Sequence, residues 1–143
     1  MYHEPYPGKE EYNHSEKYEV RYWDWEKRNK LTDVIKHVNA ARKANPALQV
    51  TNNITFCDIE NDNIIAYHKR TNDNHILCIV NIDPYRRQGG FVRVPLKELG
   101  LNNGDEFHVF DILTGATYTW STEWNYVELD PWNLPVHLFR IEI

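Results

Sequence analysis

One amphipathic helix is predicted over residues 30–45, because its apolar residues recur at the i, i+3, i+4 and i+7 positions that share one helical face. These apolar positions are Leu31, Val34, Ile35, Val38 and Ala41. Asn29 is suited to cap the first turn, and Pro46 stops the helix. We expect the apolar face to be buried, either against the remainder of this chain or against a protein body on its N-terminal side.

From residue 49 onward, short runs of branched and aromatic residues alternate with turn residues, which is typical of antiparallel β-structure. The run at 75–82 is apolar at successive positions, so we expect it to be a central strand. Thr114-Gly115 predicts a hairpin turn. Strands are expected near 53–59, 63–70, 75–82, 90–95, 106–112, 116–120, 125–129 and 136–143.

These patterns predict a mainly β fold, an antiparallel β-sandwich of Greek-key type with seven or eight strands. The helix precedes the sandwich, and residues 1–28, which are polar, acidic and aromatic without periodicity, are expected to be an irregular segment. The chain changes character near residue 48, so we divide it into residues 1–48 and a C-terminal all-β domain at 49–143.

Composition and charge exclude several classes of function. The 143 residues are 41% hydrophobic and 26% charged, with a formal net charge of −5 and no basic cluster that would track a phosphate backbone. Nucleic acid is therefore not an expected partner. No apolar run approaches the roughly 18 residues of a membrane helix, so no membrane partner is expected either. The first seven residues do not resemble a signal peptide, and the expected localisation is cytoplasmic.

Neither a metal nor a cofactor is expected. The seven histidines and two cysteines show no zinc-ligand spacing, and the chain has neither a P-loop nor a dinucleotide-binding glycine motif. Cys57 and Cys78 lie in apolar, strand-like runs, which predicts reduced thiols in the core. Catalytic carboxylates are not expected, because the acidic cluster of Glu10, Glu11, Glu16 and Glu19 lacks the rigid scaffold that an acid/base pair needs.

Five aromatic residues fall within fifteen positions: Tyr118, Trp120, Trp124, Tyr126 and Trp132. Aromatic rings present flat apolar faces together with polar groups, and such faces stack on pyranose rings. Trp120 and Trp124 are therefore candidate residues of a sugar-binding platform. The alternative is structural, with the same rings packed in the core or paired across a hairpin.

Several motifs resemble those of the bacterial maltosyltransferases that extend α-1,4-glucan with maltose-1-phosphate. This family belongs to glycoside hydrolase family 13, within the alpha-amylase superfamily. The most specific motifs are G-K-E-E-Y at 8–12 and S-E-K-Y-E at 15–19. The resemblance continues in W-D-W at 23–25, R-K-A-N-P-A-L at 42–48, V-N-I-D-P at 80–84, D-I-L-T-G at 111–115, Y-T-W at 118–120, N-Y-V-E-L-D-P at 125–131 and P-V-H-L-F-R at 135–140.

The resemblance implies that the catalytic carboxylates lie upstream of this chain, so the isolated chain is expected to be inactive. Residues 1–48 would then be the last loop and helix of the catalytic barrel, and 49–143 the C-terminal β-domain. By the same resemblance, Lys17 and Tyr18 line the donor pocket. The implied partners are α-1,4-glucan or a maltosyl donor, reached through the parent enzyme.

Two other functions remain open from the sequence. The aromatic group favours a stand-alone glucan-binding module, and the uncovered helix face favours a purely structural domain that forms a homodimer. For the helix itself we expect either that it folds back on the β-domain or that it pairs with a second copy.

Overall fold

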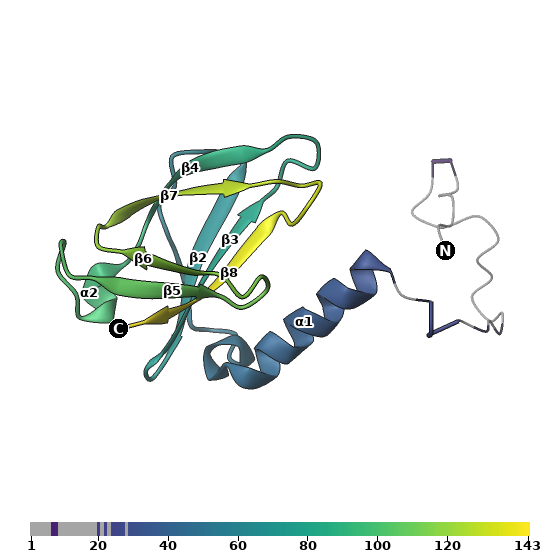
Figure 1. The fold of residues 1–143 in the computed structure, drawn as a ribbon, viewed down its shortest axis with the longest axis horizontal. Coiled ribbons are helices and arrows are strands. Elements are labelled where there is room, and N and C mark those ends of the chain that lie inside the picture. Colours follow the sequence, from purple (N-terminus) through teal and green to yellow (C-terminus); the bar gives the residue numbers. More distant parts are fainter. Residues whose placement is uncertain (1–6, 9–19, 21, 23, 28) are drawn as a thin grey trace.

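The computed structural model describes residues 7–8, 20, 22, 24–27 and 29–143, and all of its regular elements lie in the last of these ranges (Figure 1). Helix α1 (Lys30–Ala44) leads into the short 3₁₀ helix η1 (Pro46–Gln49). One further short helix, α2, spans Leu96–Leu99. The strands are β1 (Ile54–Phe56), β2 (Ile64–Thr71), β3 (Asn74–Asn81), β4 (Gln88–Arg93), β5 (Phe107–Asp111), β6 (Thr117–Trp120), β7 (Trp124–Leu129) and β8 (Val136–Glu142).

Within residues 29–143, the eight strands form two antiparallel sheets. The larger has the order β1-β2-β3-β8-β5-β6, and the smaller pairs β4 with β7. The main core lies between the sheets, where Leu77 and Phe139 of the large sheet meet Val92 and Leu129 of the small one. The predicted mainly β, sandwich-like fold is therefore confirmed.

Strand β3 is central, as predicted, and pairs with β2 on one side and β8 on the other. Leu77 and Ile79 face the core between the sheets. Ile76 and Cys78 alternate with them and face a second cluster, which includes Ala41 of α1 and Ala47 of η1. Because both faces are covered, the strand is apolar at successive positions.

The predicted turn at Thr114-Gly115 joins β5 to β6, and the hairpin is confirmed. Gly115 has a positive φ of 79°, and its N–H donates to the carbonyl of Asp111 over 2.8 Å. A residue without a Cβ suits this left-handed conformation.

Strands β6 and β7 do not pair with each other, so Trp120 and Trp124 are not partners across one hairpin, although Trp120 pairs with Phe107 across the β5–β6 hairpin. β6 pairs with β5 at the edge of the large sheet, whereas β7 pairs with β4 in the small sheet. The connecting residues 121–123 are hydrogen-bonded to the segments between β4 and β5, because the Ser121 carbonyl accepts from the Gly104 N–H and the Glu123 carbonyl from the Val94 N–H.

Helix α1 begins and ends as its sequence predicts. The Asn29 side chain accepts a hydrogen bond from the Thr32 N–H over 2.8 Å, which caps the first turn. At the other end, Asn45 donates from its side chain to the Ala41 carbonyl, and Pro46 starts η1. None of the described helices combines the length and the apolar composition that a bilayer crossing requires.

The apolar face of α1 is not covered by the β-domain, and the expectation that the helix folds back on it is wrong for this chain alone. Leu31, Ile35 and Val38 are 67%, 51% and 42% exposed, whereas Ala41 near the C-terminal end is buried. Figure 1 shows the helix projecting away from the sheets, in contact with them at its last turn. Of α1, Ala41 contributes to the second cluster, and the other members come from η1, the large sheet and the β5–β6 turn.

Candidate functional site

The predicted donor-pocket residues, Lys17 and Tyr18, lie outside the described residues. Their role stays a prediction. The structure therefore bears on the aromatic candidates, on the histidines and on the surface pockets of the β-domain.

Trp120 ends β6 and is partly buried. Its ring makes edge contacts with Phe107 and Phe139, with ring centroids 6.2 Å and 5.4 Å apart, and it packs against the main core. Such contacts fix the orientation of the indole and leave part of its surface accessible.

Trp124 begins β7 in the other sheet and is 38% exposed. Side chains alternate along β7, so Trp124 and Tyr126 lie on its outer face, where Tyr126 makes an edge contact with Phe91 of β4. The structure thus places Trp120 and Trp124 on different sheets. Sugar binding by these two residues stays a prediction.

Two tyrosines from the same aromatic group are more exposed than the tryptophans on β6 and β7. Tyr118 is 43% exposed and Tyr126 is 56% exposed, and both line a small surface pocket together with Trp120. The sequence grouped these rings, but the pocket depends on the crossing between the two sheets, which no local pattern encodes.

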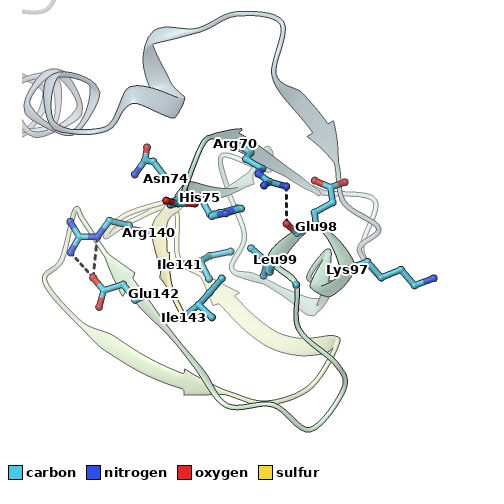
Figure 2. A pocket seen from close by; sticks show the side chains of 12 residues that line it. Arg70, Asn74, His75, Lys97, Glu98, Leu99, Arg140, Ile141, Glu142 and Ile143 are labelled. Carbon is cyan, nitrogen blue, oxygen red and sulfur yellow. Dashed lines mark hydrogen bonds and ion pairs between the residues drawn. The ribbon is translucent and has the colours of Figure 1, made fainter.

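A surface pocket of about 720 Å³ has charged, polar and apolar residues in its lining. Figure 2 shows its walls, which come from the β2–β3 turn, helix α2 and the end of β8. Arg70 closes one side, where its guanidinium donates to the Glu98 carbonyl over 3.0 Å. Lys97 and Arg140 add positive charge, and the carboxylates of Glu98 and Glu142 balance it.

His75, which lines this pocket, is hydrogen-bonded to a second histidine, His68. His68 Nδ1 lies 3.2 Å from Glu98 Oε2, and His68 Nε2 lies 3.1 Å from His75 Nδ1. The two rings are parallel within 6°, and both are buried. In the consistent arrangement of protons, His68 donates to Glu98 from Nδ1 and accepts at Nε2 from His75.

This histidine chain could have been found from the sequence. With residues 71–74 as the hairpin turn, residue 68 pairs with 77 and residue 70 with 75. His68 and His75 are then diagonal neighbours on one sheet face. The sequence analysis treated each histidine singly and missed the pair.

Burial lowers the pKa of His68 and of His75 below the ordinary value of 6.5, and the Glu98 carboxylate opposes this without overcoming it. The unfolded chain therefore binds more protons than the native protein just below pH 6.5. The stabilising contribution of the neutral pair is fully present above that pH and is lost as the pH falls towards the lowered native-state pKa values.

We expect the free energy of unfolding to decrease between about pH 7 and pH 5 because of this pair. Urea denaturation across that range measures it. Replacing both residues (His68→Gln with His75→Gln) should flatten the dependence, whereas His37→Gln, at an exposed position on α1, should preserve it. Equal slopes in all three proteins would show that the pair does not couple protonation to folding.

A second histidine contacts a buried carboxylate. His137 Nδ1 lies 2.9 Å from Asp111 Oδ2, and Asp111 is fully buried. Burial raises the pKa of Asp111, but hydrogen bonds from His137 and from the Leu113 N–H outweigh this, so that its pKa lies below the ordinary 3.8. Within the described residues, no three His, Cys, Asp or Glu side chains are grouped so that they could hold a metal ion.

Cys57 and Cys78 are both free thiols, and they contact different core clusters on opposite faces of the large sheet. Burial raises the pKa of both thiols, that of Cys57 to about 11. Both side chains are therefore protonated at neutral pH and unsuited to nucleophilic chemistry.

Comparison with solved structures supports the fold. A maltogenic alpha-amylase, AmyB from Thermotoga neapolitana, matches with a TM-score of 0.63 and 10% identity, over 82% of this chain and 26% of that chain. An Anoxybacillus alpha-amylase matches with a TM-score of 0.57 and 13% identity, over 82% of this chain and 24% of that chain. At these identities the likeness concerns the fold alone.

Sequence comparison is more specific. An alpha-1,4-glucan:maltose-1-phosphate maltosyltransferase of Chlorobaculum tepidum is 44% identical over 99% of this chain, and a Corynebacterium glutamicum protein of the same name is 45% identical over 93% of it. The chain spans 22% and 20% of the length of these two relatives. A family described as GLGE, C-terminal, matches residues 56–141. The chain therefore belongs to the GLGE C-terminal family.

Proposed function

We propose that this chain is the C-terminal part of a maltosyltransferase that extends α-1,4-glucan from maltose-1-phosphate, and that it supports the catalytic body of that enzyme. Relatives bearing this name match nearly the whole chain at 39–45% identity. Because the chain spans about a fifth of their length, the proposal assigns the transfer chemistry to the larger remainder.

The observation that carries this proposal is the open apolar face of α1. Leu31, Ile35 and Val38 recur along one side of the helix and are all exposed. An isolated helix of 15 residues gains little stability without tertiary packing, and a contiguous apolar patch marks a contact surface. A protein body that precedes the β-domain would cover this face.

The way in which α1 is attached to the β-domain is consistent with a contact between its apolar face and a preceding protein body. Its C-terminal turn is anchored through Ala41 and Asn45, which join it to η1 and β3. Asn45 accepts from the Asn74 side chain over 3.1 Å, and Asn74 in turn accepts from the Ala47 N–H over 3.0 Å. The β-domain thus fixes one end of the helix and leaves its apolar length available.

Maltosyl transfer requires catalytic carboxylates, which the proposed catalytic body has to supply. A retaining glycosyl transfer uses two carboxylates about 5–5.5 Å apart, one as nucleophile and one as acid and base. The proposal places both in the catalytic body, so the pure chain should neither release phosphate nor transfer a maltosyl unit. Donor and glucan would be bound mainly there. Two unpaired cysteines fit a reducing compartment, which supports the cytoplasm as the proposed setting.

A chimera tests the proposal. This chain would replace the corresponding segment of the Chlorobaculum tepidum relative, and phosphate release from maltose-1-phosphate would be followed with maltoheptaose as acceptor. We expect activity within about tenfold of that of the unaltered relative, a change of about 1.4 kcal/mol in the barrier. A chimera that folds but does not release phosphate would contradict the proposal.

The alternative occupant of the α1 face is a second copy of this chain. The same exposed residues would then form a homodimer of the isolated protein. Sedimentation of the pure chain distinguishes the two cases, because the favoured proposal expects a monomer at micromolar concentration and no phosphate release.

A further inference from the structure

A small pocket of about 190 Å³ lies where the edge of the large sheet meets the small sheet. Tyr118 and Trp120 come to it from β6, Tyr126 and Glu128 from β7, and His137 and Phe139 from β8. Its walls are therefore mainly aromatic, with one imidazole and one carboxylate among them.

The imidazole of His137 is held in a fixed orientation. Its Nδ1 lies 2.9 Å from the buried Asp111 carboxylate, and its ring lies flat on Phe139, with 4.8 Å between centroids and 13° between planes. With Nδ1 engaged, Nε2 is the ring nitrogen left for a ligand. Because the Asp111 carboxylate is fully buried, it holds the pocket-lining His137 in one orientation before any ligand binds.

The aromatic walls are also fixed on their inner side. Tyr118 and Trp120 both make edge contacts with Phe139, at centroid distances of 5.9 Å and 5.4 Å. On the opposite wall, Glu128 accepts a hydrogen bond from Arg87 over 3.1 Å, and Tyr126 is steadied by its edge contact with Phe91. These contacts hold the rings in place before any ligand binds, which reduces the entropic cost of binding.

We propose that this pocket binds one pyranose residue of an α-glucan. Aromatic faces match the apolar faces of a pyranose, while Nε2 of His137, the Glu128 carboxylate and the Tyr118 hydroxyl match its hydroxyl groups. An apolar peptide side chain fits less well, because it would offer no hydrogen-bond partner to Nε2 of His137. The choice of an α-glucan as the ligand rests on the proposed function, whereas the pocket itself is separate from the transfer chemistry.

An NMR titration of the isotope-labelled full chain with maltoheptaose tests the proposal. The expected result is a saturable set of shifts confined to the Trp120 indole and to amides near Tyr118, Tyr126 and His137. Tyr126→Ala should weaken binding about fivefold to tenfold, because it removes one stacking wall. Tyr118→Ala, on β6 across the pocket, should also weaken the binding of maltoheptaose.

Tyr85→Ala is the matched control, since Tyr85 is an exposed tyrosine that does not line the pocket. It should leave the dissociation constant unchanged. The unperturbed amide spectrum of each variant verifies that the fold is retained. No shift at millimolar maltoheptaose, shifts clustered elsewhere, or equal losses in Tyr126→Ala and Tyr85→Ala would each overturn the proposal. Because the titration uses the chain alone, its failure leaves the maltosyltransferase assignment unaffected.

Discussion

Leu77→Ala is expected to lower the free energy of unfolding by about 2–5 kcal/mol, the range for removing a large aliphatic side chain from a well-packed core. Leu77 is fully buried on the central strand β3 and contacts the core between the two sheets. Its neighbours on both sides are fixed by strand pairing, to His68 on β2 and to Phe139 on β8. The surroundings therefore cannot collapse into the space that the substitution leaves.

The same substitution at Leu31 provides the control. Leu31 lies on the open face of α1, so Leu31→Ala in the isolated chain should change the free energy of unfolding by less than about 0.5 kcal/mol. Urea denaturation followed by tryptophan fluorescence measures both variants. Similar costs at the two positions would mean that α1 is packed against the β-domain in solution, contrary to the structure.

The second large decrease in the free energy of unfolding is expected for Asp111→Ala. This carboxylate is fully buried and accepts hydrogen bonds from His137 and from the Leu113 N–H. Asp111→Ala removes the acceptor for both donors and leaves the His137 imidazole against an apolar wall. Leaving a buried donor without its acceptor costs about 1–3 kcal/mol for each donor.

Asp111→Asn separates charge from hydrogen bonding at this position, because the amide keeps an acceptor for the Leu113 N–H. We expect it to lose less stability than Asp111→Ala. Asp62→Ala, at an exposed position in the β1–β2 connection, is the control and should be nearly neutral. If Asp111→Ala were as stable as Asp62→Ala, the buried pair would contribute nothing to the fold.

The pH dependence gives Asp111 an independent signature. Since its native pKa lies below 3.8, its contribution is fully present above that pH and is lost as the pH falls towards the native value. The contribution of the His68–His75 pair is lost at higher pH, as the pH falls below 6.5. The acid unfolding of the natural chain should therefore show both windows, and Asp111→Asn should remove the lower one.

Much of this fold could be predicted because its signals are local. The i, i+3, i+4 pattern and the Asn29 and Pro46 signals placed α1 within one residue of its observed ends. Alternation and turn residues likewise located all the strands of the sandwich. Helix α2 was missed, because four residues are too few to show helical periodicity.

What could not be predicted depends on contacts between distant segments. The sequence does not show which strands lie beside the aromatic residues on either side of 121–123, and β6 and β7 belong to different sheets. Strand patterns give the buried face of each strand but not its partner. For the same reason the sequence pointed to Trp120 and Trp124 as a pair, whereas Trp120 lines the pocket together with Tyr118 and Tyr126, and Trp124 does not line it.

The central claim is that the apolar face of α1 joins this β-domain to a catalytic body. The most direct measurement is phosphate release from maltose-1-phosphate by the chimera with the Chlorobaculum tepidum relative, comparing Ile35→Glu with Lys36→Glu. Ile35 lies on the apolar face and Lys36 beside it on the polar side. If the face is buried, a glutamate at 35 costs several kcal/mol and lowers the rate by at least about tenfold, while Lys36→Glu has little effect. Equal rates for the two variants would contradict the claim.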